Sequence, residues 1–138
     1  MSDYEYEHTV ETSAAPEAVW ALWADVATWS SWDASVISSG LDGPFEVGGT
    51  GTMEIEGPGA IPFVLVEVEP GVSFLDETVL GEVVLRFDHR VEPRAEGGSR
   101  IWMRVTVDGP GATEMGPMVT DDTPEVLEAL ARRAEAVA

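Results

Sequence analysis

Residues 4–12 alternate between two kinds of side chain. Tyr4, Tyr6, His8 and Val10 occupy one parity, whereas glutamates and threonines occupy the other. A period of two is typical of a strand that buries one face. We therefore predict that this segment is the first strand and that its tyrosines and histidine face inward.

Further segments with strand character follow, and short turns separate them. Residues 34–39 and 50–56 flank the segment 40–49, which is rich in turn-forming residues. The remaining strand segments are residues 61–69, 73–80, 83–92 and 100–108. Strands that follow one another through short turns predict an antiparallel meander.

The segment 83–92 indicates which face of this sheet is buried. One parity holds Val83, Leu85, Phe87, His89 and Val91, and the other holds mostly charged residues. One face of the sheet is therefore predicted to be dry and the other wet. The arginines of the last two strands fall on the wet parity and predict an outer basic stripe, formed by Arg86, Arg90, Arg100 and Arg104.

Four of the five tryptophans fall within residues 19–33. Trp20 and Trp23 are one helical turn apart, and so are Trp29 and Trp32, so each pair can share one face of a short helix. We predict two short helices whose tryptophans mainly pack in the core. Among them, Trp32 is placed to reach the mouth of a pocket.

Helix boundaries can be assigned from a few residues. Pro16 fits the first position of a helix because it lacks only a donor that would be unpaired there. Asp25 is predicted to cap the second short helix. Residues 123–138 predict a final amphipathic helix, because apolar residues recur there at helical spacing. These are Val126, Leu127, Leu130, Ala134 and Val137.

The order of these elements predicts an α+β fold. A one-sided sheet with segregated helices needs a cover for its dry face, and the final helix is the element available for it. A twisted sheet of about seven strands is also expected to curl. Because no repeat or long linker divides the chain, residues 1–138 are predicted to form one domain.

Composition limits the possible binding partners of the protein and the cellular compartment expected for it. Seven basic residues against 26 acidic ones give a net charge of −19, which repels nucleic acid and anionic membranes. The absence of cysteine excludes disulfides and thiolate chemistry. The amino terminus lacks the features of a secretion signal, and no apolar run approaches the ~20 residues of a membrane span. We expect a cytoplasmic protein.

Several motifs together carry a family resemblance. They are SAAPEAVWALWADVATWSSWD at 13–33, EVGGTGTMEIEG at 46–57, FDHRVEPRAEGGSRIWMRV at 87–105 and the closing helix. In this order they resemble the polyketide cyclase/dehydrase group of the START-like, helix-grip superfamily (SRPBCC), which includes the birch pollen allergen fold. The resemblance implies a curved sheet that grips the final helix, with a pocket for apolar small molecules between them. Aromatase-like relatives orient their substrate with a pocket arginine, whereas no arginine here has inward parity.

The two histidines are the candidates for catalysis, and no other catalytic residue is predicted. Strand parity turns His8 and His89 inward, where an imidazole can orient a ligand or transfer a proton near neutral pH. The competing interpretation is a core histidine whose nitrogens are paired inside the protein. Neither histidine has a matching serine or cysteine motif for nucleophilic catalysis.

Other inward or adaptable side chains are candidates for ligand contact. A buried tyrosine can donate one directional hydrogen bond, and methionine adapts to irregular apolar shapes. Ordinary core packing is the competing interpretation for each. With the two histidines, the predicted ligand-binding residues are Tyr6, Trp32, Met53, Phe87, Met103, Met115 and Met118.

Three functions remain open. The first is binding of an apolar or aromatic small molecule between the sheet and the final helix. The second is a polyketide cyclase, aromatase or dehydratase, and the third is a structural or dimerising module whose pocket is filled by its own side chains, with a homodimer as one form. No cofactor is expected. No metal site is expected either, because the acids Asp121, Asp122 and Glu125 lie at a helix start, where the helix dipole favours them.

Overall fold

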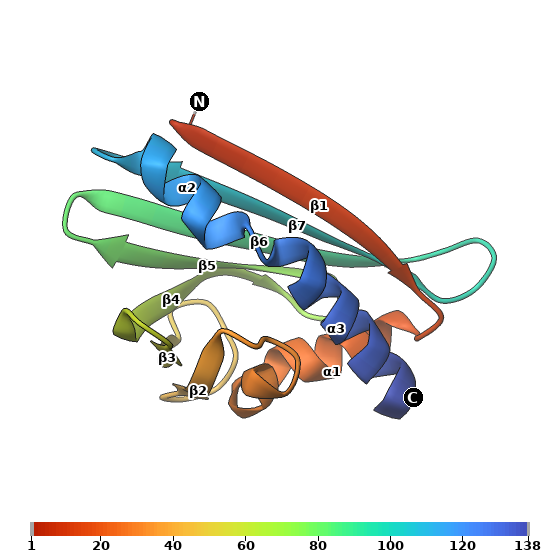
Figure 1. The fold of residues 1–138 in the computed structure, drawn as a ribbon. Helices are drawn as coiled ribbons and strands as arrows, with labels where there is room; N and C mark the ends of the chain where they lie inside the picture. The colour runs from red at the N-terminus through yellow and green to blue at the C-terminus, as the bar shows by residue number, and fades with distance from the viewer. Residues whose placement is uncertain (1, 138) are drawn as a thin grey trace.

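A seven-stranded antiparallel sheet forms the larger part of the fold (Figure 1). The computed structural model describes residues 2–137. The strands are β1 (Tyr4–Thr12), β2 (Val36–Leu41), β3 (Thr50–Ile55), β4 (Gly59–Glu69), β5 (Ser73–Leu80), β6 (Val83–Pro93) and β7 (Ser99–Asp108). The helices are α1 (Pro16–Ala24), the 3₁₀ helix η1 (Val26–Ser31), α2 (Ala112–Thr120) and α3 (Thr123–Val137). Within the described residues, none of these helices is long and apolar enough to cross a membrane.

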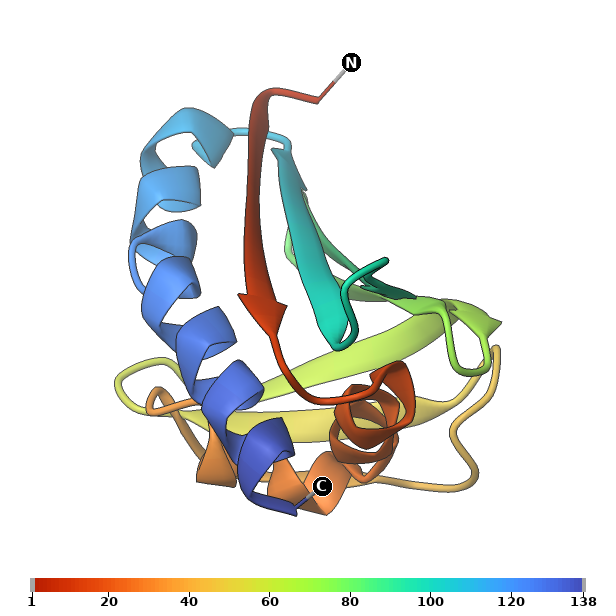
Figure 2. The same ribbon diagram turned by 90° about the vertical axis from the view of Figure 1, so that its right-hand side faces the viewer.

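The strands follow chain order in the sheet except at one edge. Their order is β1-β7-β6-β5-β4-β3-β2, so the first strand pairs with the last. The sheet curves, and α2 and α3 run across its concave side (Figure 2). The predicted fold class is confirmed: an α+β fold in which a curved antiparallel sheet of seven strands wraps around a C-terminal helix, with two short helices after strand one.

The inner side of α3 covers the dry face of the sheet, as the apolar spacing predicts. Its most buried residues, each at most 3% exposed, are Leu127, Leu130, Ala131 and Ala134. The helix is also tied to the end of β1, where Thr12 Oγ1 donates to Glu135 Oε2 over 2.7 Å. Burial of this stripe supplies the hydrophobic free energy that keeps the helix on the sheet.

The tryptophans of α1 and η1 pack at one end of the sheet. Trp23 is fully buried, with its ring centroid 5.4 Å from that of Phe74 on β5. Trp29 Nε1 donates to the carbonyl oxygen of Trp23 over 3.0 Å, which joins η1 to α1. The prediction that these residues mainly serve packing therefore holds for Trp23 and Trp29.

Helix α2 was not predicted from the sequence, which shows only a Gly- and Pro-rich stretch at this point. Gly116 and Pro117 lie inside the helix, although both residues disfavour a helix interior. The glycine is required by packing, because a Cβ at position 116 would overlap the ring of Tyr4 on β1. The Tyr4 hydroxyl also shares a 2.7 Å hydrogen bond with Thr120 Oγ1. Tertiary contacts with β1 thus override the local propensity.

The predicted cap at Asp25 is wrong in its chemistry. Asp25 does precede η1, but its side chain makes no capping hydrogen bond. Instead, Thr28 Oγ1 donates to the Asp25 carbonyl oxygen over 2.7 Å. The backbone of Asp25, not its carboxylate, therefore organises the turn between the two short helices.

Candidate functional site

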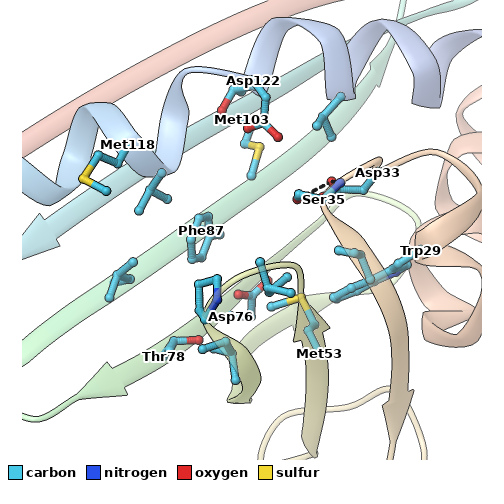
Figure 3. A pocket seen from close by; sticks show the side chains of 18 of the residues that line it. Trp29, Asp33, Ser35, Met53, Asp76, Thr78, Phe87, Met103, Met118 and Asp122 are labelled. Carbon is cyan, nitrogen blue, oxygen red and sulfur yellow. Dashed lines mark hydrogen bonds between the residues drawn. The ribbon is translucent and has the colours of Figure 1, made fainter.

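A cavity of about 700 Å³ lies between the concave face of the sheet and the helices. Figure 3 shows Met118 and Asp122 on its helical side, with Met53, Asp76 and Thr78 on the strands opposite. Strand pairing accounts for this arrangement, since alternate residues of neighbouring strands share one face of a sheet. The cavity is therefore the part of the concave space that α2 and α3 do not fill.

Aromatic and sulfur-containing side chains form much of the cavity wall. Trp29 presents a ring that stacks on Phe63, with centroids 5.4 Å apart and an interplanar angle of 26°. Phe87 projects from the middle of β6 (Figure 3). Met118 is 77% exposed and also lines the cavity, which places it at an opening. These walls favour an apolar or aromatic occupant.

Seven of the nine predicted ligand-binding residues line this cavity. They are Trp32, Met53, Phe87, His89, Met103, Met115 and Met118. Tyr6 and His8 do not, although both lie on the predicted face and are half-buried. Strand β1 packs under α2 and α3, so its inner face is covered by helix and not open to the cavity.

His89 combines features of both interpretations offered by the sequence. It is 8% exposed and stacks on Phe74, with centroids 4.0 Å apart and an interplanar angle of 6°. Its Nδ1 lies 3.4 Å from the Phe74 carbonyl oxygen, a long hydrogen bond. Because the residue also lines the cavity, His89 is a packed side chain with one face available to a ligand.

Asp76 is a buried acid of the cavity wall that the sequence pattern did not predict. It is 3% exposed, lies on β5 and pairs with Phe87 across the sheet. Its Oδ2 is 3.9 Å from His89 Nδ1, beyond hydrogen-bond distance. Two titratable groups from neighbouring strands therefore meet on one wall of an apolar cavity.

The hairpin that joins β5 to β6 could have revealed this pair. Parity within residues 73–80 is ambiguous, because both sets of alternate residues contain one acid and at least one large apolar residue. The turn at Gly81 and Glu82 pairs Leu80 with Val83, which sets the register. Counting back along that register places Asp76 on the same face as His89.

Burial keeps both groups of this pair neutral at neutral pH. Desolvation raises the pKa of Asp76 from 3.8 to about 8, and the charge of Asp88 adds to the increase. Desolvation also lowers the pKa of His89 from 6.5 to about 4, although backbone hydrogen bonds oppose it. The 3.9 Å separation would admit an ion pair, but the loss of hydration disfavours both charged forms. Asp76 can then donate a proton, and His89 can accept one.

Other polar groups near the cavity are largely engaged within the protein. Thr78 Oγ1 donates to the Pro62 carbonyl oxygen over 3.0 Å. Asp33 Oδ1 accepts from the Ser35 backbone N–H over 3.0 Å and from its hydroxyl over 2.7 Å (Figure 3). Among the described residues, Asp76 has no such partner, and the buried Nε1 atoms of Trp23 and Trp32, which also line the cavity, have none either.

A second acidic region lines the cavity where α2 meets α3. Asp121 and Asp122 lie there, and Asp33 approaches from the segment before β2. Partial burial raises the pKa of Asp122, and the negative charge of Asp33 raises it further. The two carboxyls are therefore within electrostatic reach of each other. Within residues 2–137, no cluster of three or more potential metal ligands is present.

The arginines of β6 and β7 lie on the outer face of the sheet, as predicted. Arg86 Nε pairs with Glu77 Oε2 at 2.9 Å, and Arg104 pairs with Glu5. No arginine is among the residues that line the cavity. The described part of the chain thus lacks the pocket arginine of aromatase-like relatives.

Comparison with known families agrees with this geometry. A family model described as "Polyketide cyclase / dehydrase and lipid transport" matches residues 4–135. The chain belongs to this family. The resemblance inferred from the sequence motifs is thereby confirmed, and it covers nearly the whole chain. No curated protein matches the sequence.

Solved structures share the fold of this family member at low sequence identity. A protein from Mesorhizobium loti is 14% identical with a TM-score of 0.81, over 98% of this chain and 99% of that chain. A START superfamily protein from Mycobacterium smegmatis is 12% identical with a TM-score of 0.78, over 97% and 99%. The di-domain ARO/CYC StfQ from the steffimycin biosynthetic pathway is 13% identical with a TM-score of 0.77, over 96% of this chain and 50% of that chain. These likenesses establish the helix-grip fold.

Proposed function

We propose that this protein binds an apolar or aromatic small molecule in the cavity between the sheet and the helices. The observation that carries the proposal is the cavity of about 700 Å³ with a wall of aromatic and methionine side chains. Sites for small molecules commonly have volumes of roughly 300–1,000 Å³, apolar walls and a few polar groups. The family description, which includes lipid transport, supports the same function.

A fluorescent apolar probe tests this proposal directly. N-phenyl-1-naphthylamine, which is uncharged at neutral pH, should become brighter on binding the wild-type protein. Met53→Trp should weaken binding at least about tenfold, because the larger ring occupies the cavity. Thr52→Trp is the matched control, since Thr52 is exposed on the same strand and does not line the cavity. Equal binding by both variants, or no binding by the folded wild type, would contradict the proposal.

The second candidate function is acid-base catalysis of the cyclase or dehydratase type. It is favoured by one observation, the 3.9 Å approach of Asp76 Oδ2 to His89 Nδ1 inside the cavity. For a β-hydroxy ketone, neutral His89 would remove a proton from the carbon next to the carbonyl. The C–O bond would break as the double bond forms, and protonated Asp76 would donate its proton to the leaving hydroxide, which departs as water.

Dehydration of 4-hydroxy-4-phenylbutan-2-one tests this second function, because the conjugated enone product absorbs in the near ultraviolet. Catalysis requires the wild type to exceed both Asp76→Asn and His89→Phe. A wild-type rate equal to that of both variants would leave binding as the function. The third alternative, a module with a filled pocket, predicts no cavity of this size. A homodimer and the lack of nucleic-acid binding stay predictions.

A further inference from the structure

We propose that the cavity prefers apolar molecules that carry a protonated amine, with the ammonium group paired to the Asp76 carboxylate. This inference rests on the binding function proposed above and specifies the chemistry of the ligand. It follows from the charges of the cavity wall and from the unpaired state of one buried carboxyl group.

The ionisable groups along the cavity are almost all acidic. Five carboxyl-bearing residues line it: Asp33, Glu56, Asp76, Asp121 and Asp122. Among residues 2–137, the only other titratable side chain that lines the cavity is His89, and none of the seven arginines of the chain does so. An anionic ligand such as a fatty acid would lose hydration without gaining an opposite charge, which is unfavourable. A cationic headgroup gains such partners along the cavity wall.

Asp76 supplies the specific partner for that headgroup. It is 3% exposed, and within residues 2–137 no hydrogen bond to its side chain is present. A buried polar group without a hydrogen-bond partner is unfavourable in free energy. A ligand that donates a hydrogen bond to this group removes that penalty, and its binding is strengthened accordingly. An ammonium group offers three donors, and its bond to a carboxylate is charge-assisted.

The surroundings of Asp76 also suit a cation with an apolar body. Phe87 lies next to it across the sheet, and Trp29 lines the same cavity, so aromatic rings are close to the site. Aromatic faces attract cations and pack well against apolar groups. Asp33 and Asp122, which are partly exposed and also line the cavity, add to the field that attracts a cation.

A matched series of ligands tests the inference. 1-Naphthylmethylamine, 1-naphthalenemethanol and 1-naphthoate share a bicyclic body and differ in charge. Competition against N-phenyl-1-naphthylamine at pH 7 gives the dissociation constant of each. We expect the amine to bind wild type about tenfold tighter than the alcohol, and the carboxylate to bind about tenfold more weakly than the alcohol.

Two variants assign the effect to Asp76. Asp76→Asn should reduce the affinity for the amine to that for the alcohol. Glu77→Gln is the matched control, because it makes the same acid-to-amide change at the next residue, whose side chain lies on the outer face and pairs with Arg86. This control should keep the preference for the amine. The melting temperature of each variant verifies that it is folded.

The outcomes separate the inference from the function on which it rests. If the amine and the alcohol bind equally, or if the carboxylate binds most tightly, the inference is wrong and the binding function stands. If the amine preference survives Asp76→Asn but is lost in Asp33→Asn, the assignment to Asp76 is wrong. If neither the probe nor any of the three ligands binds the folded wild type, the proposed function itself fails.

Discussion

Burial of Asp76 should make the protein less stable as the pH rises from about 6.5 to 8. Desolvation raises the pKa of Asp76 from 3.8 in the unfolded chain to about 8. Between these values the folded protein retains a proton that the unfolded chain has released, so the free energy of unfolding falls with rising pH. His89 acts in the opposite direction, because its pKa falls from 6.5 to about 4 on folding.

The two effects leave a defined pH window. Between about pH 4 and 6.5 the unfolded chain binds the His89 proton more readily, so stability from this group rises with pH and offsets the loss from Asp76. Above pH 6.5 the Asp76 contribution dominates, because more than half of the unfolded-state titration of His89 is then complete. The full slope of about 1.36 kcal/mol per pH unit applies only well below the folded-state pKa of about 8, and it has halved at that pH. Because the remaining titration of His89 also opposes it, the free energy of unfolding should fall by about 1 kcal/mol between pH 6.5 and 8.

Urea unfolding at pH 6.5 and pH 8 measures this change, with far-ultraviolet circular dichroism as the signal. Asp76→Asn places an amide of similar shape at the same position and removes the titration, so its stability should change by less than about 0.5 kcal/mol between the two pH values. Glu77→Gln should retain the wild-type decline. An equal decline in wild type and Asp76→Asn would refute the reasoning, and so would a wild type that becomes more stable.

Three further substitutions and one control test packing and the site by urea unfolding and by dehydratase activity. His89→Phe should cost less than about 1 kcal/mol, because it keeps the stacked ring and loses only a 3.4 Å hydrogen bond, whereas any dehydratase activity should vanish. Gly116→Ala should cost about 1–3 kcal/mol because its Cβ overlaps the Tyr4 ring, while Gly43→Ala, with open space around it, should have almost no effect. Leu130→Ala should cost about 3 kcal/mol, since this fully buried residue of α3 would leave a cavity in the core.

The sequence predicts most of the fold because two periods are clear in it. Strands β1, β6 and β7 alternate along most of their length, and the spacing of apolar residues in α3 is that of an amphipathic helix. Helix α2 lacks such a signal. Gly116 lies there because of its contact with Tyr4, about 110 residues away in the chain, and a local pattern does not contain that contact.

A local sequence pattern does not contain tertiary contacts, and this also explains how much of the candidate site could be predicted. Parity in β6 identifies Phe87 and His89 as inward residues, and both line the cavity. Parity also turns Tyr6 inward, but it does not specify which part of the inner face the helices cover. Asp76 is missed for a different reason, because the alternation in β5 is ambiguous until its register with β6 is known.

The two proposals require opposite protonation states of Asp76: acid-base catalysis needs the protonated acid, and amine binding needs the carboxylate. The pH dependence of stability with each ligand bound distinguishes these two states. As a proton donor, Asp76 must stay protonated near pH 7, so a neutral ligand leaves its pKa raised and preserves the decline from pH 6.5 to 8. An ammonium group at the carboxyl would favour the charged form and lower that pKa. Saturation with 1-naphthylmethylamine should therefore abolish most of the decline of about 1 kcal/mol, whereas 1-naphthalenemethanol should retain it. A decline that persists equally with both ligands would show that the amine does not pair with Asp76, whatever its affinity for the cavity.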